Sequence, residues 1–403
     1  MAKTSTKPQA TKTQPAQNQQ AEKDQRAGAQ TRQAAQAAKT PQPAPQPEQA
    51  AQPQDPQAAP RTEIGSIGEF PLIDRLTADL PLHNAGYTRK GVGDDAAVLQ
   101  LPEGEVMLVS KDLLCEGVHF DMTYCPLRHL GYKAVAVNLS DIAAMNGTPR
   151  QVLVGIAASN RYSVEALEEL YNGIRLACDR YHVDLVGGDT TSSASGLFIS
   201  ITVLGSAKPE AICYREGAKE NDLICVSGDL GGAYAGLLLL EREKRTFLAN
   251  PNSQPDFQDF SYVLERQLKP EPRTDIVKLL ADKGVKPTSM IDVSDGLSSE
   301  LLHLCERSHC GCMVYDNKIP IDAETCKALE IFDIVPTTAA LNGGEDYELL
   351  FTIAQKDYEK LKDCPEIHII GHIVEAAQGC YMIPENGPMM RLEAQGFDGF
   401  KQR

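Results

Sequence analysis

Apolar positions along most of this chain follow two patterns, one typical of strands and one typical of helices, and segments of the two kinds alternate. EVMLVSKD, RQVLVGIAAS and LFISITVLG are short runs of β-branched and aliphatic residues, which are typical of strands, as are DLICVSGD and SMIDVSDG. LGYKAVAVNLSDIAAMNGTP and SVEALEELYNGIRLACDRY carry apolar residues at helical spacing, and Gly147 and Pro149 end the first of them. LGGAYAGLLLLEREKR and GLSSELLHLCERS predict helices that begin at glycine turns after strands. This order predicts a mixed α/β (α+β) fold.

The beginning of the chain has a different composition. Residues 1–62 are rich in Gln, Ala and Pro and contain no aromatic residue. Such a segment cannot bury enough apolar area to offset its chain entropy, so we expect a disordered tail. The polar segment GSAKPEAICYREGAKEND predicts a boundary within the globular part. We therefore expect an N-terminal domain over residues 63–206 and a C-terminal domain over residues 207–403.

The overall charge and hydropathy exclude several classes of protein. The 403 residues carry a net charge of -16, which is unfavourable for binding nucleic acid unless metal ions supply positive charge. No apolar run approaches the ~20 residues that cross a bilayer, and the first residues lack the apolar core of a secretory signal. We expect a cytoplasmic protein that binds neither membranes nor nucleic acid.

The 11 cysteines are scattered and form no CxxC pair. Cys310 and Cys312, in SHCGCMV, are two residues apart, which is typical neither of a zinc knuckle nor of a redox motif. We interpret the cysteines as reduced thiols, most of them buried.

Aspartates recur where predicted strands end or helices begin. The glycine-flanked turn GVGDDAAV places two carboxylates side by side, and these would repel each other without a compensating charge. Further acids follow the runs VMLVS, VDLVGG and SMI, and one lies on a helix rich in small residues. Ligands of α/β proteins gather at strand ends, and oxygen ligands without a His/Cys set favour Mg²⁺ over zinc. The sequence therefore predicts a magnesium cluster from Asp95, Asp112, Asp141, Asp189, Asp292 and Asp295.

Other motifs are excluded or remain open. DVSDG begins like an EF-hand loop, but its glycine comes one place early and His303 holds the twelfth position. The chain has no P-loop and no protein-kinase HRD or DFG set. GDLGGAYAG could present backbone N–H groups to phosphate, or could simply be a tight turn between strand and helix. His119 is a phosphate ligand or a structural histidine.

Seven segments in series carry a family resemblance. They are GVGDDAAV, SKDLLCEGVHF, GYKAVAVNLSDIAAMNGTP, LVGGDTT, SGDLGGAYAGL, IDVSDGLSSEL and GGEDYELLFT. Over roughly residues 65–400 the chain resembles the thiamine-monophosphate kinases of the aminoimidazole-ribonucleotide-synthetase-like ATP-binding superfamily. The resemblance implies direct in-line transfer of the ATP γ-phosphoryl group to thiamine monophosphate with several Mg²⁺ ions, the final step of thiamine diphosphate biosynthesis. It also implies a homodimer whose N-terminal α/β domains, which bind ATP and Mg²⁺, form a barrel-like sheet across the dimer, plus a C-terminal α/β domain.

The resemblance also assigns roles to individual residues. The implied metal ligands are Asp95, Ser110, Lys111, Asp112, Asp141, Asp189, Asp292 and Asp295. The implied ATP contacts are Tyr171, Gly188, Asp189, Arg215 and Ser294, and the implied substrate contacts are His119, Glu345 and Phe397. No catalytic side chain is required, because the attacking phosphate oxygen is already ionised near neutral pH.

The chain departs from the family pattern at three positions. Lys111 stands where threonine is expected, and its charge would repel metal ions unless only its backbone carbonyl binds. Ser192 replaces a common arginine and Gly232 a frequent aspartate. The alternatives are another enzyme of the superfamily, such as a selenophosphate or aminoimidazole ribonucleotide synthetase, and a catalytically silent nucleotide-binding protein. The cysteine-free N-terminal segment and GGEDYEL favour the thiamine enzyme over a selenophosphate synthetase.

Overall fold

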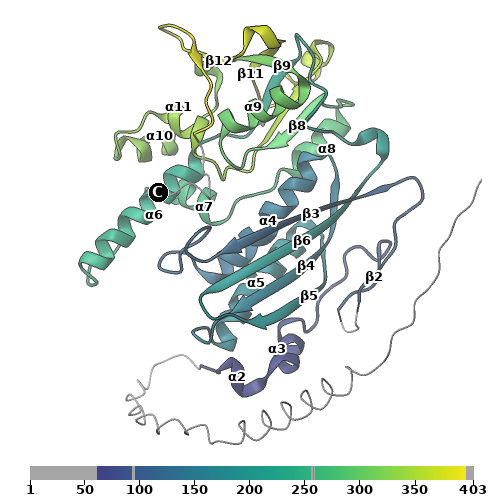
Figure 1. Ribbon diagram of the computed structural model, residues 1–403, viewed down its shortest axis with the longest axis vertical. Coiled ribbons are helices and arrows are strands. Elements are labelled where there is room, and N and C mark those ends of the chain that lie inside the picture. The colour runs from purple at the N-terminus through teal and green to yellow at the C-terminus, as the bar shows by residue number, and fades with distance from the viewer. Residues whose placement is uncertain (1–60, 93–95, 256, 258, 396–403) are drawn as a thin grey trace, which may run out of the picture. The chain divides into compact units, whose positions relative to one another are not determined.

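The computed structural model of the chain describes residues 61–92, 96–255, 257 and 259–395 (Figure 1). These residues belong to one compact unit that begins at Pro60. The tail predicted over residues 1–62 lies outside the described ranges except for its last two residues.

A four-stranded sheet forms the first layer of this unit. Its strands are β3 (Val106–Cys115), β4 (Thr148–Ala158), β5 (Asp184–Ser192) and β6 (Leu197–Ala207), in the order β3-β6-β4-β5. Only β4 and β5 run parallel. Side chains along β6 alternate between buried and half-buried, which is the period of two expected for a sheet with one covered face.

Two long helices, α4 (Leu127–Ala144) and α5 (Val164–Tyr181), pack on the covered face of this sheet (Figure 1). They cross closely because each has a glycine at the contact. A Cβ atom at Gly131 would lie 2.0 Å from the Leu170 carbonyl oxygen, and one at Gly173 would lie 1.9 Å from that of Arg128. Helix α5 begins after Ser163, whose hydroxyl accepts a hydrogen bond from the Ala166 amide at 3.3 Å.

A seven-stranded sheet forms the second part, in the order β13-β12-β9-β11-β7-β10-β8. Only β12 and β9 pair in parallel. Strand β7 lies between β11 and β10, and four of its five residues are buried. The strands are β7 (Leu223–Ser227), β8 (Ser289–Asp292), β9 (Cys310–Tyr315), β10 (Leu349–Ile353), β11 (Ile367–Glu375), β12 (Cys380–Ile383) and β13 (Met390–Arg391).

No helix among the described residues is long and apolar enough to span a membrane. The remaining helices, which surround these sheets, are α2 (Ile64–Ile67), α3 (Glu69–Leu76), α6 (Gly232–Ala249), α7 (Ser261–Leu268), α8 (Thr274–Asp282), α9 (Leu297–Ser308), α10 (Ala323–Glu330), α11 (Pro336–Asn342) and α12 (Tyr358–Leu361). A small ribbon of β1 (Thr88–Lys90) and β2 (Val98–Leu99) and four short 3-10 turns complete the described elements.

Helix α4 connects the two sheets. It contacts β3, β4 and β6 of the first sheet and also β8, α7 and α8. As a result it is buried around most of its circumference, and its buried residues include the polar Lys133, Asn138 and Ser140, whereas the sequence pattern alone indicated only an ordinary helix. The mixed α/β fold predicted from the sequence is confirmed, and so are the predicted strands and helices quoted above.

Candidate functional site

Three of the predicted acids come together from three different elements. Asp112 lies on β3, Asp141 on α4 and Asp292 at the end of β8. The Ser110 hydroxyl donates to Asp141 Oδ2 at 2.5 Å, and the Ser140 hydroxyl donates to Asp292 Oδ2 at 2.7 Å. Helix α4 therefore places its consecutive residues 140 and 141 between the two strands, at the point where the sheets meet.

Burial and mutual repulsion make these acids hard to ionise. Burial, with a contribution from the charge of Asp141, raises the pKa of Asp112 to about 6 and that of Asp292 to about 7. Burial also raises the pKa of Asp141, although the hydrogen bond from Ser110 and the charge of Arg215 act against it. Among the described residues the charge of Arg215 does not offset the effect of burial on these acids, which is the electrostatic condition that a bound cation relieves.

The turn before α9 carries a further predicted acid, Asp295. Burial raises the pKa of Asp295, and the charge of Glu345 adds to that effect while His303 opposes it. The Glu300 carboxylate accepts hydrogen bonds from the backbone amides of Ser294 (3.1 Å) and Asp295 (2.7 Å) and so fixes the turn. Burial raises the pKa of Glu300 to about 7.

Lys111 does not crowd this group. Because side chains alternate along a strand, Ser110 and Asp112 face α4. There the Ser110 hydroxyl donates a hydrogen bond to Asp141, and the Asp112 backbone amide donates one to Asn138. The Lys111 amine is directed to the opposite face of the sheet, where it hydrogen-bonds the Ser200 hydroxyl. The repulsion expected from a lysine at this position is thus avoided by the orientation of its side chain.

Asp189 is not brought to this group within one chain. Across the sheet, Asp112 of β3 pairs with Ile201 of β6, which pairs with Val154 of β4, which in turn pairs with Gly188 of β5. Asp189 therefore lies on the opposite edge strand of the sheet. Three strand spacings amount to about 14 Å. Contrary to the expectation from the sequence, Asp112 and Asp189 both lie inside strands, because β3 and β5 continue beyond them to Cys115 and Ser192.

The residues expected to contact nucleotide are similarly divided. Tyr171 is buried on α5 and hydrogen-bonds Thr190 on β5, so it lies with Gly188 and Asp189. Arg215 is exposed and its charge acts on Asp141 and Asp292. Ser294 lies in the turn before α9.

The residues expected to contact the second substrate occupy different settings. Glu345 accepts hydrogen bonds from the Lys133 amine (3.0 Å) and the Gln267 amide (2.8 Å). His119 is exposed after β3, and its Nδ1 accepts the Cys115 amide at 3.0 Å. Asp95 and Phe397 lie outside the described residues.

The glycine-rich segment GDLGGAYAG is a tight strand–helix turn whose amides are already engaged. The Asp346 carboxylate accepts hydrogen bonds from the Gly231 amide at 2.7 Å and the Ala233 amide at 3.2 Å. Arg266 pairs with Asp346 and with Glu348. An acid of the chain itself thus occupies the place that a phosphate could have taken. Gly232 has little room for a side chain, because a Cβ there would lie 3.2 Å from Arg266 Cγ.

Sequence reasoning missed two residues that lie among the acids. Lys133 is buried on α4 and donates to Glu345. Tyr347 has a positive φ of 52°, and burial together with the charges of Glu345 and Asp292 raises its pKa. A lysine inside the otherwise apolar stretch GYKAVAVN was the available signal for the first, since a buried lysine needs a carboxylate partner.

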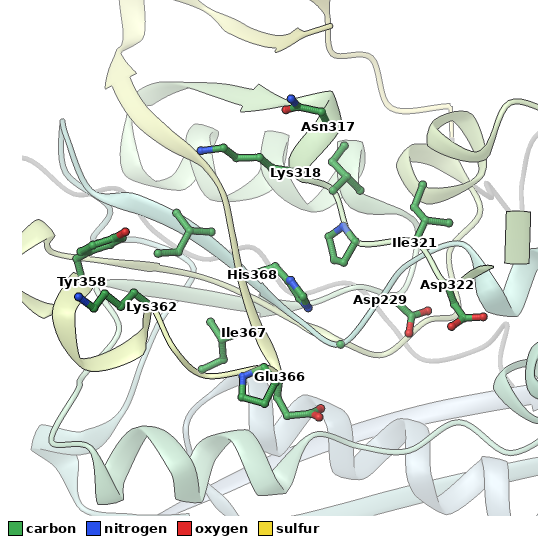
Figure 2. A pocket seen from close by; sticks show the side chains of 15 residues that line it. Asp229, Asn317, Lys318, Ile321, Asp322, Tyr358, Lys362, Glu366, Ile367 and His368 are labelled. Atoms are coloured by element: carbon green, nitrogen blue, oxygen red, sulfur yellow. The ribbon is translucent and has the colours of Figure 1, made fainter. Parts of the chain in front are cut away.

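A pocket of about 880 Å³ lies elsewhere, between β11 and the segment after β9 (Figure 2). Asp229 and Asp322 lie at one end of it and Tyr358 and Lys362 at the other. None of the predicted site residues that the structure describes lines it. The acidic cluster, defined as Asp112, Asp141 and Asp292, is therefore a separate place in the fold.

Comparison with known proteins identifies similar chains. Residues 93–207 match the family model "AIR synthase related protein, N-terminal domain". The thiamine-monophosphate kinase of Bacillus subtilis (strain 168) is 34% identical over 340 residues, which cover 83% of this chain and 99% of that protein. The thiamine-monophosphate kinase of Escherichia coli (strain K12) is 32% identical over 342 residues, covering 83% of this chain and 98% of that protein.

Solved structures agree with these relatives. The thiamine-monophosphate kinase of Stenotrophomonas maltophilia K279a superposes with a TM-score of 0.67 at 32% identity, covering 78% of this chain and 96% of that one. A structure described as AaThiL complexed with AMPPCP and TMP has a TM-score of 0.63 at 30% identity, covering 83% and 98%. The hydrogenase maturation protein HypE in complex with ATP has a TM-score of 0.62 and 19% identity, covers 80% and 94%, and shares the fold.

Proposed function

This chain belongs to the thiamine-monophosphate kinase family, and we propose that it transfers the γ-phosphoryl group of ATP to thiamine monophosphate, giving thiamine diphosphate. The observation that carries the proposal is the acidic cluster. The family relationship supports it, because the similarity covers 99% of the Bacillus subtilis enzyme. The reaction joins two anions, so alignment and charge compensation are the main requirements.

We propose that the acidic cluster binds Mg²⁺. Its donors are carboxylate oxygens, and the hydroxyl of Ser110 and the backbone of Lys111 adjoin them. This set suits a hard divalent cation, whose charge would offset the repulsion between the two substrates. Two unit charges ~4 Å apart cost about 4 kcal/mol at an effective dielectric constant near 20.

Other residues of the chain hold the proposed metal ligands and substrate contacts in position. Ser110 and Ser140 hold the carboxylates of Asp141 and Asp292, and Glu300 holds the turn that carries Ser294. We propose that Ser294 and Arg215 contact ATP, and that His119 and Glu345 contact the acceptor, in the roles that the family resemblance gives them. We extend these roles to Asp95 as a metal ligand and Phe397 as a substrate contact.

We propose further that the chain acts as a homodimer with a shared barrel-like sheet. The uncovered face of the four-stranded sheet exposes Met107 (44%), Val109 (62%) and Leu113 (53%), and both β3 and β5 are edge strands. Closing two such sheets into one barrel would join β5 of one subunit to β3 of the other. This arrangement would bring Asp189, with Gly188 and Tyr171, to the acidic cluster. Val109→Asp should then give monomers in light scattering, and Val335→Asp, at an exposed position of the second part, should not.

One incubation tests the reaction. The full chain with ATP, Mg²⁺ and thiamine monophosphate should yield thiamine diphosphate and ADP on chromatography, and thiamine should be a poor acceptor because it lacks the phosphate nucleophile. Asp141→Asn should reduce turnover by roughly a thousandfold, the factor that corresponds to about 4 kcal/mol. Asp282→Asn, at an exposed end of α8, is the matched control.

Two results would contradict the proposal. ATP binding without thiamine diphosphate formation would favour the silent nucleotide-binding protein. Normal turnover of Asp141→Asn at limiting Mg²⁺ would contradict the proposal that the acidic cluster binds the metal. A cytoplasmic location, which we propose from the sequence, is tested separately by cell fractionation.

A further inference from the structure

Four of the cysteines gather in one place although they lie far apart in the sequence. Cys305 is on α9, Cys310 and Cys312 are on β9, and Cys380 begins β12. The Sγ atoms of Cys305, Cys312 and Cys380 all lie within 4.8 Å of one another. Cys310 faces the same side of β9 as Cys312 and its thiol interacts with that of Cys305. We name these four residues the thiol cluster.

The backbone around the thiol cluster is built for close approach. A Cβ at Gly311, between the two β9 cysteines, would lie 2.3 Å from the carbonyl oxygen of Gly379. Gly379 itself has a φ of +75°, a conformation that favours glycine. The Cys312 amide donates to the Gly379 carbonyl at 3.1 Å, and Cys380 pairs with Cys312 in the parallel register of β12 and β9. Two glycines therefore bring the thiols of two strands side by side.

The mutual distances favour a metal site over the two other uses of cysteine. In tetrahedral thiolate coordination, sulfurs about 2.3 Å from zinc lie about 3.8 Å from one another, which small side-chain rotations of the thiol cluster would reach. Two disulfides would join the four sulfurs in pairs, whereas three of them lie within 4.8 Å of one another, an arrangement that a shared ion explains and pairing does not require. A single buried thiol such as Cys225 acts as a small apolar side chain, but apolar packing does not require three sulfurs from three elements to meet.

We propose that the thiol cluster binds one Zn²⁺ ion, with Cys305, Cys312 and Cys380 as ligands and Cys310 completing the set. Thiolates select a thiophilic cation, in contrast to the oxygen donors of the acidic cluster. A full set of protein ligands closes the coordination sphere, so the role is structural. The ion would join the C-terminal end of α9 to β9 and β12, while the other end of α9 carries the turn of Asp295 (Figure 1).

Metal analysis of the full chain tests this proposal without any activity measurement. Protein purified without chelators should contain about one zinc per chain, and replacement by Co²⁺ should give the near-ultraviolet charge-transfer absorbance of cobalt–thiolate bonds. Cys312→Ser should weaken zinc binding by more than the about 10–100-fold that loss of an outer-shell contact causes. Cys380→Ser, at a half-buried position, should do the same and serves where the Cys312 variant fails to fold.

The control is Cys326→Ser, a half-buried cysteine of α10 outside the thiol cluster. It should retain zinc and the cobalt spectrum, and a zinc-selective chelator should lower its thermal midpoint as it does that of the unaltered chain. The proposal is overturned by absence of the cobalt–thiolate band, or by normal zinc content in Cys312→Ser and Cys380→Ser. A disulfide among the four residues in a metal-free, fully stable protein would overturn it as well.

Discussion

Replacing Asp292 with asparagine should stabilise the metal-free protein at neutral pH. Asp292→Asn removes a buried charge but keeps an oxygen that can accept the hydrogen bond of Ser140, now 2.7 Å from Oδ2. Burial and the charge of Asp141 raise the pKa of Asp292 to about 7 in the folded protein. The unfolded chain therefore releases this proton at lower pH than the folded one. The free energy of unfolding should consequently fall as the pH rises from about 4 to about 7.

The size of the effect follows from that shift. One pKa unit corresponds to about 1.4 kcal/mol, so a change from 3.8 to about 7 corresponds to roughly 4 kcal/mol. The asparagine also buries an amide that lacks an assigned partner, which costs about 1–3 kcal/mol at every pH. The stability of Asp292→Asn relative to the unaltered chain should therefore increase by roughly 4 kcal/mol between pH 4 and pH 8, whatever its starting value.

Urea unfolding in EDTA between pH 4 and pH 8 measures this difference. Asp282→Asn, at an exposed position, should show no such trend. Adding Mg²⁺ at pH 8 should stabilise the unaltered chain and should stabilise Asp292→Asn much less. A difference between variant and unaltered chain that stays constant across the pH range would refute the reasoning, because it would mean that the Asp292 carboxylate ionises normally in the fold.

Three further predictions concern other parts of the molecule. Because burial raises the pKa of Asp112 to about 6, Mg²⁺ binding at pH 6 should release protons, and titration calorimetry in buffers of different ionisation heat should find less release at pH 8. Gly173→Ala should lower the free energy of unfolding in urea by about 1–3 kcal/mol, whereas Gly65→Ala, with open space around it, should not. Asp346→Asn should lower the free energy of unfolding by about 1–3 kcal/mol, because its single amide oxygen can replace only one of the two carboxylate oxygens that accept from Gly231 and Ala233, and a cost no larger than that of Asp282→Asn would contradict this account.

The sequence predicted the elements well where a local pattern decides them. The alternation along LFISITVLG and the glycine and proline after α4 depend only on neighbouring residues, and both predictions are confirmed. The gathering of Asp112, Asp141 and Asp292 needed the fold, because 151 positions separate Asp141 from Asp292 in the numbering. The sequence predicted that these acids meet, although only Asp292 lies at the end of its strand.

Other features could not be found from local spacing. A search for CxxC pairs passes over the thiol cluster, since its members come from α9, β9 and β12. The occupation of the α6 amides by Asp346 was equally hidden, because 115 residues separate Asp346 from Gly231. The separation of Asp189 from Asp112 follows from strand order, which periodicity does not determine.

The two adjacent serine and aspartate residues of α4 have a mechanical consequence. Ser140 is bonded to the end of a strand in one sheet, and Asp141 to the edge strand of the other. Any hinge movement between the two sheets must stretch one of these bonds, so opening and closing of the molecule would register directly at its carboxylates. A cation bound to these carboxylates would add a further link between the two sheets, and its loss would remove that link.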